Sequence, residues 1–359
     1  MRILVVGGTG FIGTPLVRQL CSLGHEVTVY HRGVHEPRLP AAVKHVCSPL
    51  AGIPVVAYPP SLRDEAFDVV VHLTLTGRRD AEAAVDAFRH TADRLVVASS
   101  CDVYARYGRL LGIERVSEEE RRHDEAPLAE DAPLRRARFP YGKQWIGPWN
   151  QPLDYEKLLV EETVLASAHP RGTVLRLPAV YGPDDSHRRF MPWVKRMRDG
   201  RKAILMGRSR AGSRVPHGYV DNVAWAITLA ATRAAASGRI YNVGEAETPS
   251  GAELVAAIGA AAGWKGEIVV LPDDRMPAHL AGPYRACADL TLDTSRIREE
   301  LGFREVVPPP DALRRTVAWE SATGFSSVDP RGFDYPAEDL ALKVAGENGH
   351  EEGSSRAIS

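Results

Sequence analysis

Short apolar runs alternate with amphipathic stretches through the first half of the chain. The apolar runs, rich in Val, Ile and Leu, cover residues 2–7, 26–32, 67–73, 94–99 and 172–182. Stretches with apolar residues at helical intervals lie between them, over residues 11–24, 79–90 and 152–165. Strands that are apolar along their whole length and are separated by helices are typical of a parallel sheet covered on both faces. We therefore predict an α/β fold with a doubly wound parallel sheet.

The pattern changes near residue 184, where the predicted strands become shorter and helices take up more of the chain. A closing helix is predicted over residues 308–324, and the composition turns polar and charged soon after it. We predict three parts from this pattern. They are a sheet domain over residues 1–183, a smaller α/β lobe over 184–325, and a disordered tail over 326–359, of which the residues after about 330 contribute nothing to the fold.

Composition and charge exclude several classes of partner. Charged residues make up 25% of the chain and the formal net charge is −1, without the clustered Lys and Arg of a nucleic-acid surface. No apolar run approaches the ~20 residues of a membrane helix. The chain enters a strand at once rather than a signal peptide, and its four cysteines show no C-x-x-C spacing. We expect a cytoplasmic protein with free thiols, acting on a small molecule rather than on a membrane or nucleic acid.

A glycine turn links the first predicted strand to the first helix. In "VVGGTGFIG", Gly7, Gly10 and Gly13 are each three residues apart. In a dinucleotide site the first glycine makes the tight turn and the second lets the backbone approach the pyrophosphate. The third allows close helix–strand packing, and the helix N-terminus faces the phosphates. Because the motif directly follows an apolar strand, it predicts a Rossmann-type dinucleotide-binding domain.

The end of the second predicted strand indicates which cofactor is bound. An NAD site usually carries an acidic residue there for the ribose 2′-hydroxyl, but "VYHRG" has none from Val27 through His35. Arg32 is placed to pair with a 2′-phosphate, which favours NADP. NAD stays an alternative, since Arg32 could instead stack on the adenine ring. His31 and His35 fall in a loop, so we expect no metal site.

Several motifs, in order along the chain, resemble those of a known family. They are "GGTGFIG", "SSCDVY", "KLLVEE", "LRLPAVYGP", "HGYVDNVA" and "YNVGE". With them the sequence resembles the NAD-dependent epimerase/dehydratase family, the extended and atypical short-chain dehydrogenase/reductases, over roughly residues 1–320. The resemblance implies a smaller C-terminal substrate lobe that exchanges a strand and a helix with the sheet domain. It also implies a small hydroxylated or carbonyl substrate, with a nucleotide sugar as one candidate, and leaves a homodimer open.

The same resemblance assigns the candidate site residues. The cofactor-binding residues are expected to be Gly7, Thr9, Gly10, Phe11, Ile12, Gly13, Arg32 and Lys157. Ser100 stands three residues before the "VY" pair, where the family has a hydroxyl that binds the reacting oxygen. Lys157 matches the family lysine, which binds the nicotinamide ribose and lowers the pKa of a nearby tyrosine. Ser100, Lys157 and a tyrosine are therefore the expected catalytic residues.

The tyrosine departs from the family pattern. The family places it four residues before the lysine, where this chain has Leu153. Tyr155 lies about 200° around a regular helix from Lys157 and would point away, unless residues 153–155 form a distorted first turn. Tyr141 in the preceding loop is the second candidate, and a site in which no tyrosine acts is the third. We favour Tyr155.

Other positions modify the expected chemistry. Family dehydratases carry an acidic pair before "VY", whereas this chain has Cys101 followed by Asp102, which leaves acid–base work to Asp102. The second lobe is expected to bring Tyr181, Arg188, Arg189, Arg214 and His217 towards the substrate. We expect an NAD(P)-dependent epimerase, dehydratase or reductase. Leu153 favours the alternative, a non-catalytic dinucleotide-binding sensor or RNA-associated scaffold on the same fold.

Overall fold

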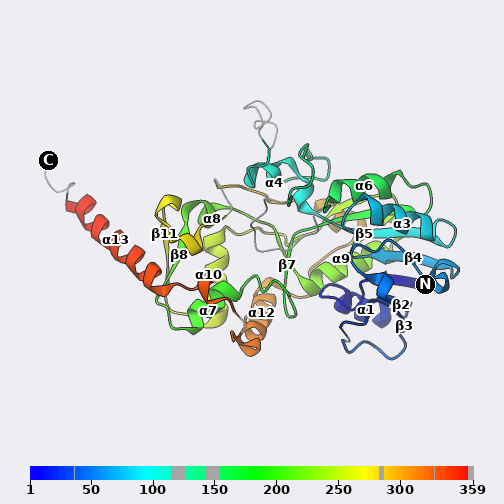
Figure 1. Cartoon of the computed structure of the whole chain (residues 1–359), viewed down its shortest axis with the longest axis horizontal. Coiled ribbons are helices and arrows are strands. Elements are labelled where there is room, and N and C mark those ends of the chain that lie inside the picture. The colour runs from blue at the N-terminus through cyan, green and yellow to red at the C-terminus, as the bar shows by residue number, and fades with distance from the viewer. Residues whose placement is uncertain (36, 115–125, 143–153, 283–286, 327, 355–359) are drawn as a thin grey trace.

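The computed structural model describes residues 1–35, 37–114, 126–142, 154–282, 287–326 and 328–354. The large sheet and its helices form one end of the molecule, and the smaller lobe forms the other (Figure 1). The N-terminus lies in the sheet and the C-terminal helix projects from the smaller lobe.

The larger part is a parallel sheet of seven strands in the order β10-β6-β5-β4-β1-β2-β3. The strands are β1 (Arg2–Val6), β2 (Glu26–His31), β3 (Lys44–Cys47), β4 (Phe67–His72), β5 (Ala92–Ser100), β6 (Arg171–Leu177) and β10 (Ile240–Asn242). From β1 the chain winds outward to β2 and β3, then returns to β4 on the other side of β1. This reversal confirms the predicted doubly wound sheet. A ligand crevice is expected where the carboxyl ends of β1 and β4 diverge.

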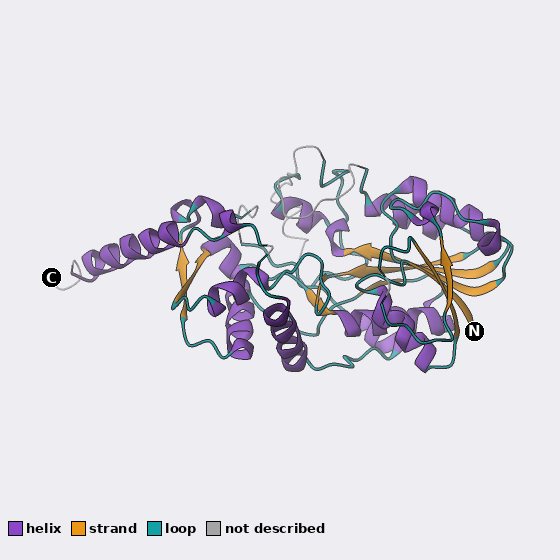
Figure 2. Ribbon diagram, turned by 60° about the horizontal axis from the view of Figure 1, so that its bottom comes forward, coloured by secondary structure: helices purple, strands orange, loops and turns teal. Residues whose placement is uncertain are grey.

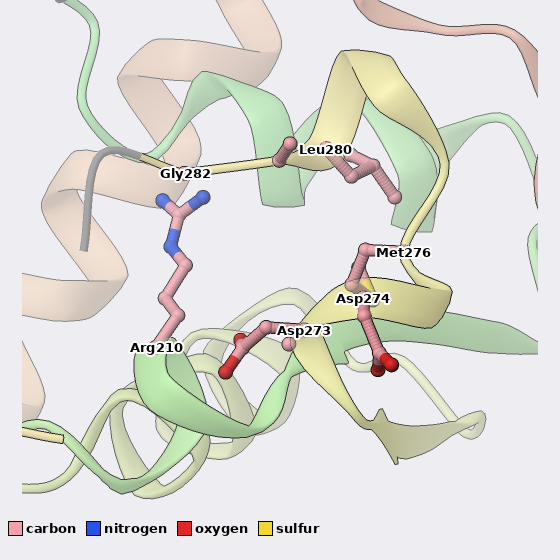
Figure 3. Close-up of a pocket in the computed structure, with 8 residues that line it drawn as sticks. Arg210, Asp273, Asp274, Met276, Leu280 and Gly282 are labelled. Carbon is pink, nitrogen blue, oxygen red and sulfur yellow. The ribbon is translucent and has the colours of Figure 1, made fainter. Parts of the chain in front are cut away.

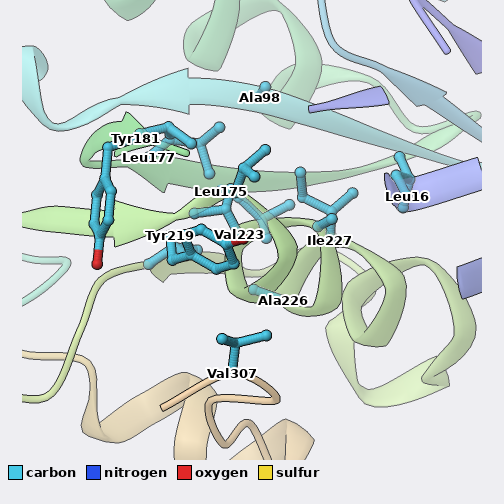
Figure 4. Close-up of a cluster of buried hydrophobic side chains, with 14 of the residues drawn as sticks. Leu16, Ala98, Leu175, Leu177, Tyr181, Tyr219, Val223, Ala226, Ile227 and Val307 are labelled. Atoms are coloured by element: carbon cyan, nitrogen blue, oxygen red, sulfur yellow. The ribbon is translucent and has the colours of Figure 1, made fainter. Parts of the chain in front are cut away.

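Alternate residues of the strands serve two separate cores, one on each face of the sheet. In β1, Ile3 and Val5 pack into the cluster with α1 (Gly13–Ser22) and α9 (Val220–Thr232). Leu4 and Val6 pack into the other, with α3 (Arg78–Phe88) and α6 (Lys157–Ala166). Because both faces of the sheet are buried, the residues that point to either face are apolar. The strand therefore appears in the sequence as one continuous apolar run. Figure 2 shows the helices on either side of the sheet. Figure 4 shows part of the core between the sheet and α9, with Leu16 and Ile227 among its residues.

The smaller lobe is built from two short parallel strand pairs and several helices. β7 (Ala179–Tyr181) pairs with β9 (His217–Tyr219), and β8 (Ala203–Gly207) pairs with β11 (Glu267–Leu271). Its helices are α7 (Met191–Arg198), α8 (Arg208–Gly212), α10 (Gly251–Ala262) and α12 (Pro309–Thr323). The later helix α11 (Ser295–Leu301) packs instead against β10 and α9 at the large sheet. Short elements elsewhere in the chain and in this lobe complete the fold. They are the α-helices α2 (Pro60–Arg63) and α4 (Ala105–Leu110) and the 3₁₀ helices η1 (Pro49–Ala51), η2 (Cys101–Val103), η3 (Ala234–Ala236), η4 (Asp273–Arg275) and η5 (Ala278–Leu280).

The two parts are threaded through each other. β10 comes after β7, β8 and β9 in the chain, yet it pairs with β6 at the edge of the large sheet. α9 likewise follows the smaller lobe's first elements and packs beside α1 on the large sheet. The large sheet is therefore completed by segments that follow residue 184.

The C-terminal segment is helical where the sequence predicts disorder. After η6 (Pro330–Gly332), α13 spans Tyr335–Ser354. Glu338 in its first turn is fully buried, and its carboxylate pairs with Arg196 of α7 at 2.7 Å. The prediction of a disordered tail is corrected for the described part of this segment. Average composition does not reveal one buried ion pair that fixes a helix to the body.

The outer edge of the large sheet is formed by β3, a strand of four residues. Lys44 at its start is exposed and pairs with Glu65 at 2.7 Å. His45 beside it is exposed as well, so the edge presents polar side chains over the first two of its four residues.

Candidate active site

The glycine turn has the backbone geometry that a dinucleotide needs. Gly7 adopts a left-handed conformation with φ of 88°, and its carbonyl accepts the Gly10 N–H at 3.2 Å. A Cβ on Gly13 would lie 2.2 Å from the Gly7 oxygen, so only glycine allows this packing. Thr9, Phe11 and Ile12 are partly buried in the same turn. α1 then starts without an acidic residue in its first turn, which favours an anion at its N-terminus.

Arg32 lies beside this turn. It directly follows β2, and its side chain is exposed. The Gly7 N–H donates to Tyr30 O at 3.1 Å, so the last residues of β2 adjoin the glycine turn. His31 accepts the Gly33 N–H at 3.2 Å, and Gly33 with φ of 77° turns the chain away. A contact of Arg32 with a 2′-phosphate fits this position and stays a prediction.

Two tyrosine hydroxyls converge on one buried carboxylate. The Tyr155 hydroxyl donates to Asp102 Oδ2 at 3.0 Å, and the Tyr141 hydroxyl donates to the same oxygen at 3.1 Å. Their rings lie 5.3 Å apart, and Asp102 is 2% exposed. The structure thus brings together both tyrosines that the sequence offers as alternatives. Asp102 is the residue that joins them.

Tyr155 reaches Asp102 because it lies outside the helix. α6 begins at Lys157, with Glu156 as its N-cap in extended backbone. The expectation that Tyr155 points away assumes a regular helix through residue 155, and it fails because the helix starts two residues later. Nor is a distorted first helical turn formed at Asp154 and Tyr155, which precede the cap. Leu153 lies outside the described residues.

Burial shifts the pKa values of this cluster. Burial raises the pKa of Asp102, and the Arg135 guanidinium partly offsets that rise. Burial, followed by the Asp102 charge, raises the pKa of Tyr155 well above its ordinary value. Burial also raises the pKa of Tyr141. The carboxyl therefore binds a proton more readily than usual, while both phenols hold theirs.

Lys157 stands at the carboxyl edge of the sheet. Its Nζ donates to Leu75 O at 2.5 Å, after β4, and to Ala98 O at 2.9 Å, in β5. The ammonium lies 5.6 Å from the centre of the Tyr155 ring. Burial lowers the pKa of Lys157, and the nearby Asp102 charge opposes that change. These two bonds use two of the three donors of an ammonium group.

Ser100 ends β5 and begins η2. Its Oγ accepts the Asp102 N–H at 3.2 Å, which fixes Asp102 in the turn. Tyr155 also has a side-chain hydrogen-bond interaction with Ser100. The three expected catalytic residues Ser100, Tyr155 and Lys157 thus adjoin one another, and their catalytic roles stay predictions.

A buried ion pair supports the cluster, and the sequence does not reveal it. Arg135 Nη2 contacts Glu156 Oε1 at 3.0 Å, and both side chains are inaccessible. Arg135 Nε donates to the Asp102 carbonyl. Glu156 also accepts the Leu158 N–H at 3.0 Å, which caps α6. One ion pair therefore fixes the Asp102 turn and the start of α6 together. Arg135 lies in the loop before the site, where no motif marks it.

All five polar residues expected to face the substrate from the second lobe have partners within the protein. Arg188 pairs with Glu320 at 2.7 Å, and Arg189 pairs with Asp185 at 2.8 Å. Arg214 contacts Glu253 at 3.2 Å. Tyr181 donates to Glu245 at 2.7 Å. His217 bonds Val215 O at 2.7 Å, and burial lowers its pKa to about 4, so it is neutral at pH 7.

The second lobe holds a cavity of about 310 Å³ between β8 and the segment that follows β11. It is lined by Gly207, Arg210, Asp273, Asp274, Met276, Leu280, Ala281 and Gly282. Figure 3 shows Arg210 extending across the space toward Gly282, with Asp273 and Asp274 at its other side. Asp273 accepts a hydrogen bond from Ser209 Oγ at 2.6 Å. Arg210 is the one cationic residue among the described lining residues, and its guanidinium lies 4.5 Å from the centre of the Trp193 ring.

Two general features bear on the function. Within the described residues, no helix combines the length and apolar character needed to cross a membrane. Among those residues, no three His, Cys, Asp or Glu side chains are grouped to hold a metal ion.

The sequence matches the model of the NAD dependent epimerase/dehydratase family over residues 3–244. A dTDP-glucose 4,6-dehydratase of Streptomyces griseus is 29% identical over 335 residues, covering 89% of this chain and 93% of that protein. A 2-alkyl-3-oxoalkanoate reductase of Stenotrophomonas maltophilia (strain K279a) is 29% identical over 286 residues, covering 73% of this chain and 76% of that protein.

Solved structures share the fold at lower identity. The UDP-glucose 4-epimerase of Thermus thermophilus, in complex with NAD, superposes with a TM-score of 0.60. It is 22% identical, and the match covers 90% of this chain and all of that one (100%). An epimerase of Methanothermobacter thermautotrophicus reaches a TM-score of 0.65 at 16% identity, over 90% of this chain and 92% of that one.

Proposed function

Since this chain belongs to the NAD-dependent epimerase/dehydratase family, we propose that it is an NADP-dependent oxidoreductase acting on a nucleotide sugar. Family membership makes it a nicotinamide-dependent enzyme of the epimerase, dehydratase or reductase type, and the choice of NADP is part of the proposal. The nucleotide sugar is proposed because one relative is named for dTDP-glucose and a structural neighbour for UDP-glucose. The relative named a 3-oxoalkanoate reductase makes a simple carbonyl substrate the second candidate.

The observation that carries the proposal is the convergence of Tyr155 and Tyr141 on Asp102. The two hydroxyl–carboxylate distances are 3.0 and 3.1 Å, beside a lysine ammonium at the carboxyl edge of the sheet. A scaffold that only binds a dinucleotide has no need of a buried carboxylate with two phenolic donors. Such a group is costly to bury and suits proton transfer.

In this proposal the bound cofactor supplies or accepts a hydride at its nicotinamide ring. The protein moves the proton. When a substrate hydroxyl is oxidised, its proton passes to the Tyr155 oxygen while the Tyr155 proton passes to Asp102 Oδ2. Reduction of a carbonyl runs the same transfers backwards. Tyr155 then stays neutral before and after the reaction, and the raised pKa of Asp102 helps it to hold the proton.

Ser100 and Lys157 orient the reactants. The Ser100 Oγ already accepts the Asp102 N–H, so its own proton can be donated to the reacting oxygen of the substrate. Lys157 is fixed by two carbonyls at 2.5 and 2.9 Å and directs its remaining donor to a ribose hydroxyl. Its positive charge also lowers the cost of an ionised Asp102.

The cavity of the second lobe is assigned to the nucleotide part of the substrate. Arg210 lines it as a cation, and a guanidinium suits a diphosphate. Arg32 is assigned to the 2′-phosphate of NADP, since no acidic side chain follows β2 through His35. These two arginines thus serve two different phosphate groups.

The test compares Tyr155→Phe and Asp102→Asn with the control Tyr241→Phe. Tyr241 donates to Glu300 at 2.8 Å, in β10 and away from the cluster. Each site variant should lower hydride transfer by about 10²–10⁴-fold, the usual worth of general acid–base catalysis. Cofactor affinity and the control should be unchanged. Net oxidation or reduction is followed as NADPH absorbance with UDP-glucose, dTDP-glucose and a 3-oxoalkanoate. Epimerisation and dehydration regenerate the cofactor, so they are followed by chromatography of the sugar nucleotide.

Two results would contradict the proposal. If wild type binds the cofactor but transfers no hydride with any of these substrates, the non-catalytic alternative is favoured. If Asp102→Asn retains full turnover while Tyr155→Phe does not, the proton leaves Tyr155 by another route.

A further inference from the structure

The cavity of the second lobe has one wall with little secondary structure of its own. This wall, residues 273–282, contains only the short turns η4 and η5. It supplies Asp273, Asp274, Met276 and Leu280 to the lining. Its start is fixed because Asp273 accepts the Ser209 N–H and hydroxyl at 3.1 and 2.6 Å. The middle of the wall has no comparable bond to β8 or α8 among the described contacts.

A buried carboxylate from the C-terminal helix holds the middle of this wall. His279 of η5 donates from Nε2 to Glu338 Oε1 at 3.0 Å, and its side chain is 11% exposed. Glu338 is inaccessible to solvent and also binds Arg196 of α7 through Nε and Nη2 at 3.2 and 2.7 Å. One carboxylate therefore links the body, the C-terminal helix and the cavity wall.

Further contacts fix the segment that carries Glu338. The Arg196 guanidinium lies 4.7 Å from the centre of the Phe333 ring, and its Nη2 donates to Gly332 O at 3.0 Å. Arg201 pairs with Asp339 at 2.5 Å. Arg196 of α7 and Arg201, which follows this helix, thus anchor the start of α13 and give Glu338 a fixed position from which to hold His279.

We infer that the C-terminal segment 330–339 belongs to the substrate site, with Glu338 and His279 as positioning residues for the cavity wall. The inference rests on the proposed function, which gives this cavity to the nucleotide part of the substrate. Loss of the His279–Glu338 bond should free residues 276–282 and widen the cavity around Arg210. Substrate affinity should then fall, whereas the cofactor turn after β1, which makes no contact with this wall among the described residues, should be unaffected.

The experiment uses His279→Ala, because Glu338 itself cannot be removed without leaving Arg196 buried and unpaired. His279→Gln is the rescue variant, since its amide can donate to the same carboxylate. Asp86→Asn is the control, because it removes the exposed ion pair with Arg89 on α3, away from the cavity and from the C-terminal segment. Full-length proteins are compared by amide hydrogen exchange of residues 276–282 and by calorimetric titration with UDP-glucose and NADP.

His279→Ala should speed exchange of these amides and raise the Kd for UDP-glucose by about tenfold, as expected for one charge-assisted hydrogen bond. His279→Gln should restore most of both values, and neither the control nor NADP affinity should change. Unaltered exchange and UDP-glucose affinity in His279→Ala would overturn the inference and leave the proposed function intact. If wild type binds no UDP-glucose, the substrate assignment fails, and the inference fails with it even where exchange changes.

Discussion

At the scale of single residues, Arg32 decides the predicted choice of cofactor. Its exposed side chain follows β2 beside the glycine turn. A guanidinium–phosphate contact, absent with NAD, is worth about 1.5–3 kcal/mol. Arg32→Ala should therefore weaken NADP binding by one to two orders of magnitude and leave NAD affinity nearly unchanged. Titration of both cofactors checks this, with the exposed Arg89→Ala as control. Equal affinity of wild type for both cofactors would remove the assignment.

Glu245 makes stability depend on pH. Burial raises its pKa from an ordinary value of 4.5 to about 7, although its carboxylate accepts the Tyr181 hydroxyl. Because the folded state binds this proton more tightly, the stabilisation is complete below about 4.5 and is lost as the pH rises through about 7. It is worth at most about 3 kcal/mol.

Glu245→Gln should therefore flatten the pH dependence of the free energy of unfolding between pH 5 and 8. The amide keeps an acceptor for Tyr181 and carries no charge, so the variant should be more stable than wild type at pH 8. Urea denaturation at a series of pH values measures the effect. A wild-type stability that rises over this interval would show that other groups outweigh Glu245.

At the scale of secondary structure, α6 is held to β6 by a buried ion pair. Arg176 of β6 contacts Glu161 of α6 at 2.8 Å, and Ser99 donates to the same carboxylate at 2.5 Å. Removing the arginine leaves a buried charge without its partner, so Arg176→Met should cost about 3–5 kcal/mol of stability. The exposed pair of Arg239 and Glu300 is the control, and Arg239→Met should cost at most about 1 kcal/mol. Denaturant unfolding distinguishes the two, and equal losses would contradict this account.

The strands and the glycine turn could be predicted because each is encoded locally. Buried parallel strands are apolar throughout. Gly7 is required by its positive φ, and Gly13 by its close approach to the backbone of Gly7 and Gly8. The start of α6 could not be placed, because it depends on Glu156, whose side chain both caps the helix and pairs with Arg135. The position of Tyr155 follows from that pair. Sequence periodicity describes a helix and gives little information about the residue at which it begins.

At the scale of the whole molecule, the large sheet depends on segments that come late in the chain. β10 extends it and α9 covers one face beside α1, although both follow residue 184. We expect a fragment of residues 1–183 to expose that apolar face and to fail to fold or to aggregate. The full chain should unfold in a single transition, because neither part is complete alone. Circular dichroism of the fragment and calorimetry of the full chain test both points. A folded, cofactor-binding fragment would contradict them.

The C-terminal segment shows that amino-acid composition alone does not predict whether a segment is ordered. Its sequence is polar and charged, which predicts disorder, yet Glu338 is buried against Arg196 and His279. The contacts of this one carboxylate with Arg196 and His279 order the segment, although its overall composition is polar and charged. Such contacts join residues more than 50 positions apart, and no local pattern records them.

The short edge strand β3 affects the tendency of the protein to aggregate at high concentration. An open sheet edge offers unpaired backbone groups, onto which a strand from another molecule can add to start aggregation. Here the edge is four residues long and begins with the exposed, paired Lys44. A lysine on so short an edge leaves little room for an incoming strand and adds the cost of stripping water from a charge. We therefore expect the short edge strand β3 to hinder the pairing of strands between molecules at high concentration.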